Sequence, residues 1–154
     1  MNPQSEPTLL HFIIFSDLAI REHGTGKTSL IGTFDQFNIP SFPFRTPPFF
    51  VTIGITNVHL TRGVGEPPRE VNVNVRVEDR KTGHVFGNAT GKIGLHEGKT
   101  HPREAPLMIT LPLPPMTFMQ PGPVTAVVNV DNERVGDRTL MINPLSAPAT
   151  PTNS

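Results

Sequence analysis

The chain has 154 residues, and its 13 basic and 13 acidic side chains give a formal net charge of zero at pH 7. This length fits one domain with its own core. The balanced charge gives no footprint for nucleic acid or for an acidic membrane surface. The absence of cysteine excludes disulfides and thiol-based zinc sites. Charged residues make up 17% of the chain, below the roughly 25% of an average soluble domain, which favours a surface that assembles with other chains.

The beginning of the sequence carries no export or membrane signal. Residues 1–7 contain no basic stretch of the kind that opens a secretory signal. No apolar run approaches the ~20 residues that a membrane-spanning helix needs. We therefore expect a cytoplasmic protein with no membrane partner.

Two apolar runs, at residues 11–21 and 28–39, flank a glycine turn. Both runs are rich in Ile, Leu and Phe, and His23-Gly24-Thr25-Gly26 lies between them. Glycine accepts the positive φ of a tight hairpin turn without a Cβ clash. The pattern predicts a β-hairpin, with Lys27 as a solvated charge beside the turn.

The same residues permit an alternative, because Gly26-Lys27-Thr28 matches the end of a phosphate-binding loop. The full signature is G-x-x-x-x-G-K-[ST] at the start of a helix. Here Arg21 stands where the first glycine belongs, and the residues after Lys27 are rich in β-branched side chains, which form helices poorly. The alternative function is a nucleotide-binding enzyme with a degenerate loop at residues 24–29; the hairpin is favoured.

A stretch of alternating proline and phenylalanine, PSFPFRTPPFF, follows at residues 40–50. Proline cannot donate to a sheet ladder, so we expect a connection or an edge here, not a central strand. The rings either plug one end of the domain as core side chains or form an exposed patch that binds a partner or another copy. On the second interpretation the candidate interaction residues are Phe42, Phe44 and Phe49.

The clearest strand signal lies at residues 71–78, where every second residue is valine and the others are Asn, Arg or Glu. A period of two predicts a strand with one buried and one solvated face. A preceding strand is expected at 51–60. After a loop at 79–83 we expect a return strand that glycines interrupt.

Further strands are predicted at 107–113, 124–130 and 135–142, the last two joined by a turn at Asp131-Asn132. The 18 prolines are spread along the chain and oppose helix formation. The sequence thus predicts an all-β, antiparallel β-sandwich of about eight strands over residues 1–143. Residues 144–154, mostly Pro, Ala, Thr and Ser, are expected to form an extended or disordered tail.

Residues 20–43 resemble the N-terminal hallmark of an uncharacterised bacterial family of small β-sandwich domains. In that family a glycine turn is followed by LIGxFD and then by PSFP. The matching residues here are Gly24, Gly26, Leu30-Ile31-Gly32, Phe34-Asp35 and Pro40-Ser41-Phe42-Pro43. Pro121-Gly122 and Val128-Asn129-Val130-Asp131 also resemble the last hairpin of the family, so the likeness covers most of the chain. It implies an immunoglobulin-like sandwich and brings no known activity or catalytic residue.

Polar clusters that could carry chemistry are few. The string from His96 to His101, HEGKTH, departs from the zinc motif H-E-x-x-H, because its histidines are five apart around a glycine. We interpret it as a surface loop. His11, His59 and His84 could form a site only if the fold brings them together. Asp35, a carboxylate among apolar residues, has no assigned role.

No serine or threonine is accompanied by the base and acid that nucleophilic catalysis needs. Ser16 and Ser29 lie in strand-like runs with no strand-to-helix elbow beside them. The sequence therefore predicts a non-enzymatic sandwich, a structural or protein-interaction module that binds a protein partner or copies of itself. We expect no catalytic residue, no metal and no cofactor.

Overall fold

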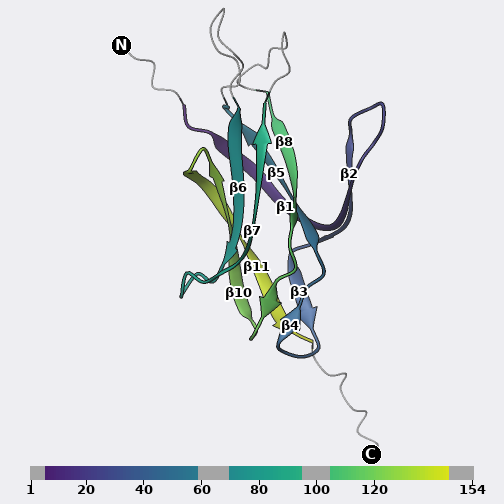
Figure 1. Ribbon diagram of the computed structural model, residues 1–154, viewed down its shortest axis with the longest axis vertical. Coiled ribbons are helices and arrows are strands. Elements are labelled where there is room, and N and C mark those ends of the chain that lie inside the picture. The colour runs from purple at the N-terminus through teal and green to yellow at the C-terminus, as the bar shows by residue number, and fades with distance from the viewer. Residues whose placement is uncertain (1–5, 59–69, 95–104, 146–154) are drawn as a thin grey trace, which may run out of the picture.

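The computed structural model describes residues 6–58, 70–94 and 105–145, and Figure 1 shows them as strands joined by turns. The described residues contain no helix, so the all-β prediction is confirmed. Among them are eleven strands: β1 (Leu9–Arg21), β2 (Thr28–Phe34), β3 (Gln36–Ile39), β4 (Phe44–Arg45), β5 (Phe49–Thr56), β6 (Val71–Glu78), β7 (Val85–Ile93), β8 (Leu107–Leu113), β9 (Thr117–Phe118), β10 (Gly122–Val130) and β11 (Glu133–Pro144). Two of these are only two residues long, which accounts for most of the excess over the predicted eight.

The strands form two main sheets and one small one. Sheet A has the strand order β2-β1-β5-β8, sheet B has β3-β11-β10-β6-β7, and β4 pairs with β9 in sheet C. All pairs are antiparallel except β3 with β11, which is parallel. One hydrophobic core takes buried side chains from both main sheets, as in a sandwich.

The alternating valines at residues 71–78 form a strand with one buried face, as their period predicts. Val71, Val73, Val75 and Val77 are buried in the core, and the polar residues between them lie on the other face of β6. On the opposite side of the core, β5 contributes Phe49, Val51, Ile53 and Ile55, and Thr52 and Gly54 between them are buried as well. The two strands therefore supply facing layers of the sandwich.

The sequence predicted one strand over residues 28–39, and this prediction is wrong because the structure has two strands there. The chain leaves sheet A after Phe34 and enters sheet B at Gln36, so β2 pairs with β1 and β3 pairs with β11. Asp35 is the crossing point, and its carbonyl accepts a hydrogen bond from the Met141 amide at 3.3 Å. Apolar residues continue on both sides of the crossing, so the sequence pattern does not mark it.

The proline-rich stretch is a connection, as predicted, and carries the two-residue strand β4. Thr46 fixes it to the chain after β8, because its amide donates to the Met116 carbonyl at 2.8 Å and its hydroxyl accepts from the Met116 amide at 3.0 Å. Thr46 is buried, so these bonds satisfy groups that water cannot reach.

The last hairpin is also as predicted. Asp131 and Asn132 both have positive φ, 49° and 67°, in the turn between β10 and β11, which suits the two residue types that tolerate this region best after glycine. The Asp131 carboxylate accepts a hydrogen bond from the Asn72 amide at 3.0 Å. This bond links the turn to the start of β6.

The last strand runs one residue past 143, the expected end of the domain. β11 includes Pro144, which is in register with Ile39, and the Leu145 amide donates to the Ile39 carbonyl at 2.8 Å. The remainder of the predicted tail, residues 146–154, lies outside the described residues.

Truncation at two points tests this boundary. A chain ending at Asn143 should be less stable than one ending at Leu145 by about 1 kcal/mol, because it loses a backbone hydrogen bond to β3. For a domain of this size the difference corresponds to a fall of roughly 2–4 °C in Tm. Thermal unfolding followed by circular dichroism measures it; equal Tm values for the two truncations would place the boundary at 143 after all.

Candidate interaction surface

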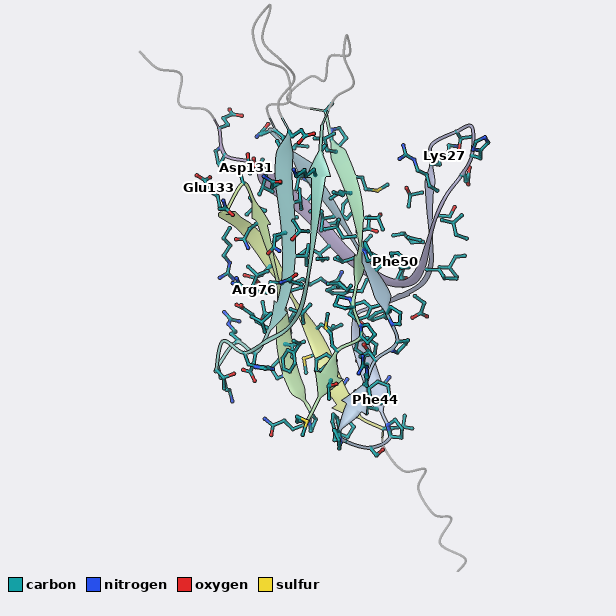
Figure 2. The ribbon with its side chains drawn as sticks, viewed as in Figure 1. Lys27, Phe44, Phe50, Arg76, Asp131 and Glu133 are labelled. Atoms are coloured by element: carbon teal, nitrogen blue, oxygen red, sulfur yellow. The ribbon has the colours of Figure 1, made fainter. Side chains whose placement is uncertain are left out.

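The three predicted interaction residues lie at the end of the sandwich that the β4–β9 pair closes. Phe49 is 1% exposed and belongs to the core, and Phe42 and Phe44 are half-buried and pack against it. Figure 2 shows Phe44 at this end of the molecule. The placement fits the interpretation in which the rings plug the sandwich. A buried Phe49 is not part of an exposed patch, and binding through Phe42 and Phe44 stays a prediction.

Exposed apolar side chains gather elsewhere, on sheet A. Of the large hydrophobic residues with substantial exposure, most come from β1, β2 and β8: Leu9, Phe12, Leu18, Ile20, Ile31 and Met108. The others are scattered over different strands and turns: Val85, Met119, Met141 and Leu145. A grouped set of exposed apolar residues marks an interaction surface more strongly than single ones do.

The β1–β2 hairpin extends beyond the sheet that carries it. Pairing of β1 with β5 ends at Ser16 and Phe50, whereas pairing of β1 with β2 continues to Arg21 and Thr28. Residues 17–33 therefore form a two-stranded ribbon, here called the arm. Figure 1 shows the arm leaving the body and curving alongside β8 at a distance from it.

A glycine lies where the arm bends away. Gly32, opposite Asp17 in the register, has a φ of 68°, a conformation that side chains rarely adopt. A Cβ at Gly32 would also collide with the Asp17 carboxylate. Both the positive φ and the lack of space for a Cβ therefore require glycine at this position. The sequence pattern alone did not reveal this bend.

The tip of the arm is the predicted glycine turn. The Glu22 amide donates to the Lys27 carbonyl at 2.7 Å, and Gly24 and Gly26 have φ of 90° and 69°. The Glu22 carboxylate accepts from the Thr25 hydroxyl at 2.9 Å. Residues 24–29 lead into a strand rather than a helix, so they lack the helix N-terminus of a phosphate loop. The hairpin prediction is confirmed.

The two faces of the arm differ in exposure. Leu18 lies opposite Ile31 in the register, with Ile20 two residues further along β1. These three side chains share one face and are 51%, 48% and 48% exposed. Ala19 and Leu30, paired on the other face, are half-buried. One face of the arm is therefore an unpartnered aliphatic surface.

The outer face of sheet A continues this apolar character on the body. Phe12 lies over Gly54, where any Cβ would collide with its ring, and Gly54 is in register with the exposed Met108. In the next row the Thr52 and Thr110 hydroxyls share a hydrogen bond of 2.9 Å. This bond gives each of the two hydroxyls a partner within the sheet.

A groove of about 550 Å³ lies between the arm and this outer face. The arm contributes Ala19, Arg21, Gly26 and Thr28, and the body contributes Phe50, Met108, Ile109 and Thr110. Figure 2 shows Phe50 between the body and the arm, and Lys27 toward the free end of the arm. Arg21 is the one charged residue in this lining.

The outer face of sheet B is different in kind. Asn72, Asn74, Arg76 and Glu78 project from β6 on that side, and Arg76 Nε forms an ion pair with Glu78 Oε2 at 2.7 Å. Lys92 of β7 lies 3.8 Å from Glu70. This face is mainly polar, with Val85 and Met141 as its exposed large hydrophobic residues, whereas sheet A carries more of them on β1, β2 and β8.

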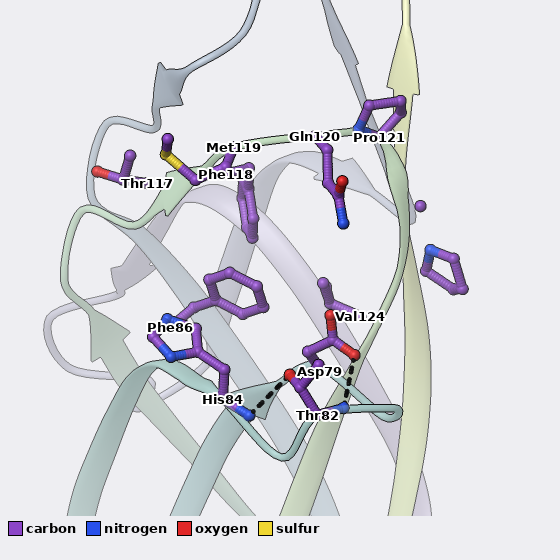
Figure 3. Close-up of a pocket in the computed structure, with 12 residues that line it drawn as sticks. Asp79, Thr82, His84, Phe86, Thr117, Phe118, Met119, Gln120, Pro121 and Val124 are labelled. Atoms are coloured by element: carbon purple, nitrogen blue, oxygen red, sulfur yellow. Dashed lines mark hydrogen bonds between the residues drawn. The ribbon is translucent and has the colours of Figure 1, made fainter.

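A second hollow lies at the end of the sandwich near the turn after β6 (Figure 3). Its volume is about 230 Å³, below the 300–1,000 Å³ of usual small-molecule sites. Its polar groups serve the local turn: the Asp79 carboxylate accepts from the Thr82 amide, and the Thr82 hydroxyl accepts from the His84 amide, both at 3.2 Å. The hollow offers little for a ligand.

The candidate chemical groups in the described part of the chain do not converge. His11 contacts the Thr56 hydroxyl at 2.7 Å, and His84 lies against the Phe86 ring. No cluster of three His, Asp or Glu suited to a metal occurs in residues 6–58, 70–94 and 105–145. His59 and the string from His96 to His101 lie outside these ranges. The Asp35 carbonyl, rather than its carboxylate, supplies the recorded hydrogen bond at the sheet crossing.

Comparison with known proteins gives a family without an assigned activity. A family model described as "Family of unknown function (DUF6941)" matches residues 11–143, which span every strand from β1 to β11. No curated protein matches the sequence. In the described part of the chain, no helix is long and apolar enough to cross a membrane.

Variants of the arm tip test the turn. Lys27→Ala should change the free energy of unfolding by less than about 0.5 kcal/mol, because Lys27 is exposed. Gly24→Val with Gly26→Val should destabilise the protein, because a β-branched residue cannot adopt positive φ without strain. Urea unfolding measures both; a large loss of stability in Lys27→Ala would contradict the account of the turn.

Variants of the two half-buried rings test the end plug. Phe42→Ser with Phe44→Ser should lower the free energy of unfolding by roughly 2–4 kcal/mol, less than two fully buried phenylalanines would cost. Ser41→Ala, at an exposed position in the same segment, serves as a control. A double variant as stable as the wild type would show that the rings do not contribute to the core.

Proposed function

The chain belongs to the family of unknown function DUF6941, and we propose that its domain is a non-enzymatic structural or protein-interaction module. The observation that carries this proposal is the arm with its exposed aliphatic face, next to the apolar outer face of sheet A. The proposed role is to bind a protein through these surfaces, with no catalytic step and no cofactor.

The low stability expected of an uncovered ribbon supports a binding role for the arm. A two-stranded ribbon is marginally stable by itself in water, and free strand edges with apolar side chains favour aggregation. Leu18, Ile20 and Ile31 gain little from burial within their own domain, because about half of each side chain faces solvent. A partner that covers them would recover the missing hydrophobic stabilisation, about 25 cal/mol per Å² of apolar surface.

Polar side chains that could suggest an enzyme instead form hydrogen bonds that stabilise turns. Carboxylates of Glu22, Asp79 and Asp131 accept hydrogen bonds from hydroxyl or amide groups of nearby turns. Acidic residues in such positions stabilise turns. Their environment supports a structural rather than a catalytic use.

Three finer expectations from the sequence stay predictions: an immunoglobulin-like relationship, a bacterial origin of the family, and a cytoplasmic location. The alternative function, a nucleotide-binding enzyme, depends on residues 24–29. The turn geometry at Gly24 and Gly26 speaks against it.

Nucleotide titration separates the proposal from this alternative. Isothermal titration calorimetry with ATP and GTP in the presence of Mg²⁺ should show no saturable binding to the wild type. The Lys27→Ala variant provides the matched control, because it would remove the phosphate contact of a loop while leaving the hairpin folded. Saturable binding by the wild type that disappears in Lys27→Ala would overturn the proposed function.

A further inference from the structure

We infer that the partner covering the arm is a second copy of this chain, held in a reciprocal clasp. Each copy places the aliphatic face of its arm in the groove between the arm and body of the other. This inference rests on the proposed function, since it names the partner of the same surface. The interface is a symmetric dimer of the common two-fold kind.

The two halves of the clasp are both present on one chain. The arm presents Leu18, Ile20 and Ile31 on a single face. The groove presents Phe50 and Met108 from the body, and Met108 is 51% exposed. Methionine and phenylalanine accommodate aliphatic side chains well, because methionine is flexible and polarisable. A surface that carries both the projection and its receptor is suited to copies of itself.

The edge of the arm lacks the usual protection against pairing. Natural edge strands carry charges or proline that prevent contact with other strands. The sequence of β2, TSLIGTF, contains neither. Two other sheet edges carry such residues within the strand, Lys92 in β7 and Pro112 in β8, whereas β3 (QFNI) contains neither. β2 is thus one of two such edges, and it is the one that projects from the body, which favours a partner that covers the arm.

Charge along the arm favours copies that lie in opposite directions. Asp17 lies at the base, whereas Arg21 and Lys27 lie near the tip, where Glu22 offsets one of the two positive charges. In a reciprocal clasp the tip of one arm approaches the base of the other, so opposite charges meet. The formal net charge of zero means that two copies do not repel each other overall.

The size of the surface is adequate for a stable dimer. A standard interface uses about 20–30 residues from each partner. Each copy offers the arm at residues 17–33 and the groove-lining residues of β5 and β8. Two equivalent contacts form at once, and the second is effectively intramolecular, which strengthens the assembly.

Light scattering coupled to size-exclusion chromatography tests the clasp with separate arm and groove variants. Wild-type protein should have the mass of two copies at micromolar concentration. The arm variant Leu18→Ser with Ile31→Ser, and the groove variant Met108→Lys, should each raise the Kd of the dimer at least about 100-fold. All three altered side chains are about half exposed, and circular dichroism verifies that both variants remain folded.

A matched control and a mixing experiment make the test specific. Val85→Ser with Leu145→Ser removes exposed aliphatic residues outside the arm and groove, and it should leave the mass of two copies unchanged. An equimolar mixture of the arm variant and the groove variant can form one intact contact, between the arm of the groove variant and the groove of the arm variant, so any heterodimer should be weaker than the wild-type dimer. Neither variant alone has such a contact.

Three outcomes would overturn the inference: a wild-type mass of one copy at every concentration, a dimer that persists in both variants, or a heterodimer of the two variants that is as stable as the wild-type dimer. The first outcome, combined with no nucleotide binding, rejects the second copy as occupant and leaves the interaction module with a foreign partner. Nucleotide binding that depends on Lys27 rejects the module itself, whatever the mass.

Discussion

A cluster of phenylalanine rings holds the two main sheets together at the base of the arm. Phe34 lies 4.8 Å from Phe37 and 5.5 Å from Phe49 between ring centroids, and Phe15 lies 6.0 Å from Phe34. These rings come from β1, β2, β3 and β5, so the cluster spans the crossing from sheet A to sheet B. Each close ring pair adds about 0.5–1.5 kcal/mol beyond its burial. The cluster thus anchors both the sheet crossing and the arm.

The position of this ring cluster accounts for the difference between the two sides of the molecule. The chain beyond Phe15 leaves the body, and the chain before Phe34 returns to it, so everything between must be stable as a ribbon or be covered by a partner. Sheet B, on the other side of the core, presents polar side chains and an ion pair on its outer face. Only sheet A combines an apolar outer face with a projecting apolar ribbon among the described residues. The functional proposal depends on this contrast.

The sequence predicted the features that depend on local chemistry. Glycines at 24 and 26 indicated the hairpin turn, and the valine alternation indicated the buried face of β6. The sheet crossing at Asp35 was missed, because Phe34 and Phe37 remain apolar on both sides of it and pack against the same core. The bend at Gly32 was missed because a single glycine inside a strand pattern signals many structures. Proline between aromatic residues left two interpretations open for Phe49, a core ring or part of an exposed patch, and tertiary packing buries that ring.

The central claim is that the arm is covered by a second copy, and concentration-dependent hydrogen exchange tests it most directly. Amides of residues 18–21 and 28–31 and those around Met108 should exchange more slowly as protein concentration rises through the dimer Kd. Amides of the turn at residues 131–133 should exchange at a constant rate, because this turn lies on the opposite side of the body from the arm (Figure 2). Exchange from the arm that does not change with concentration, or protection that appears at this turn instead, would contradict the account.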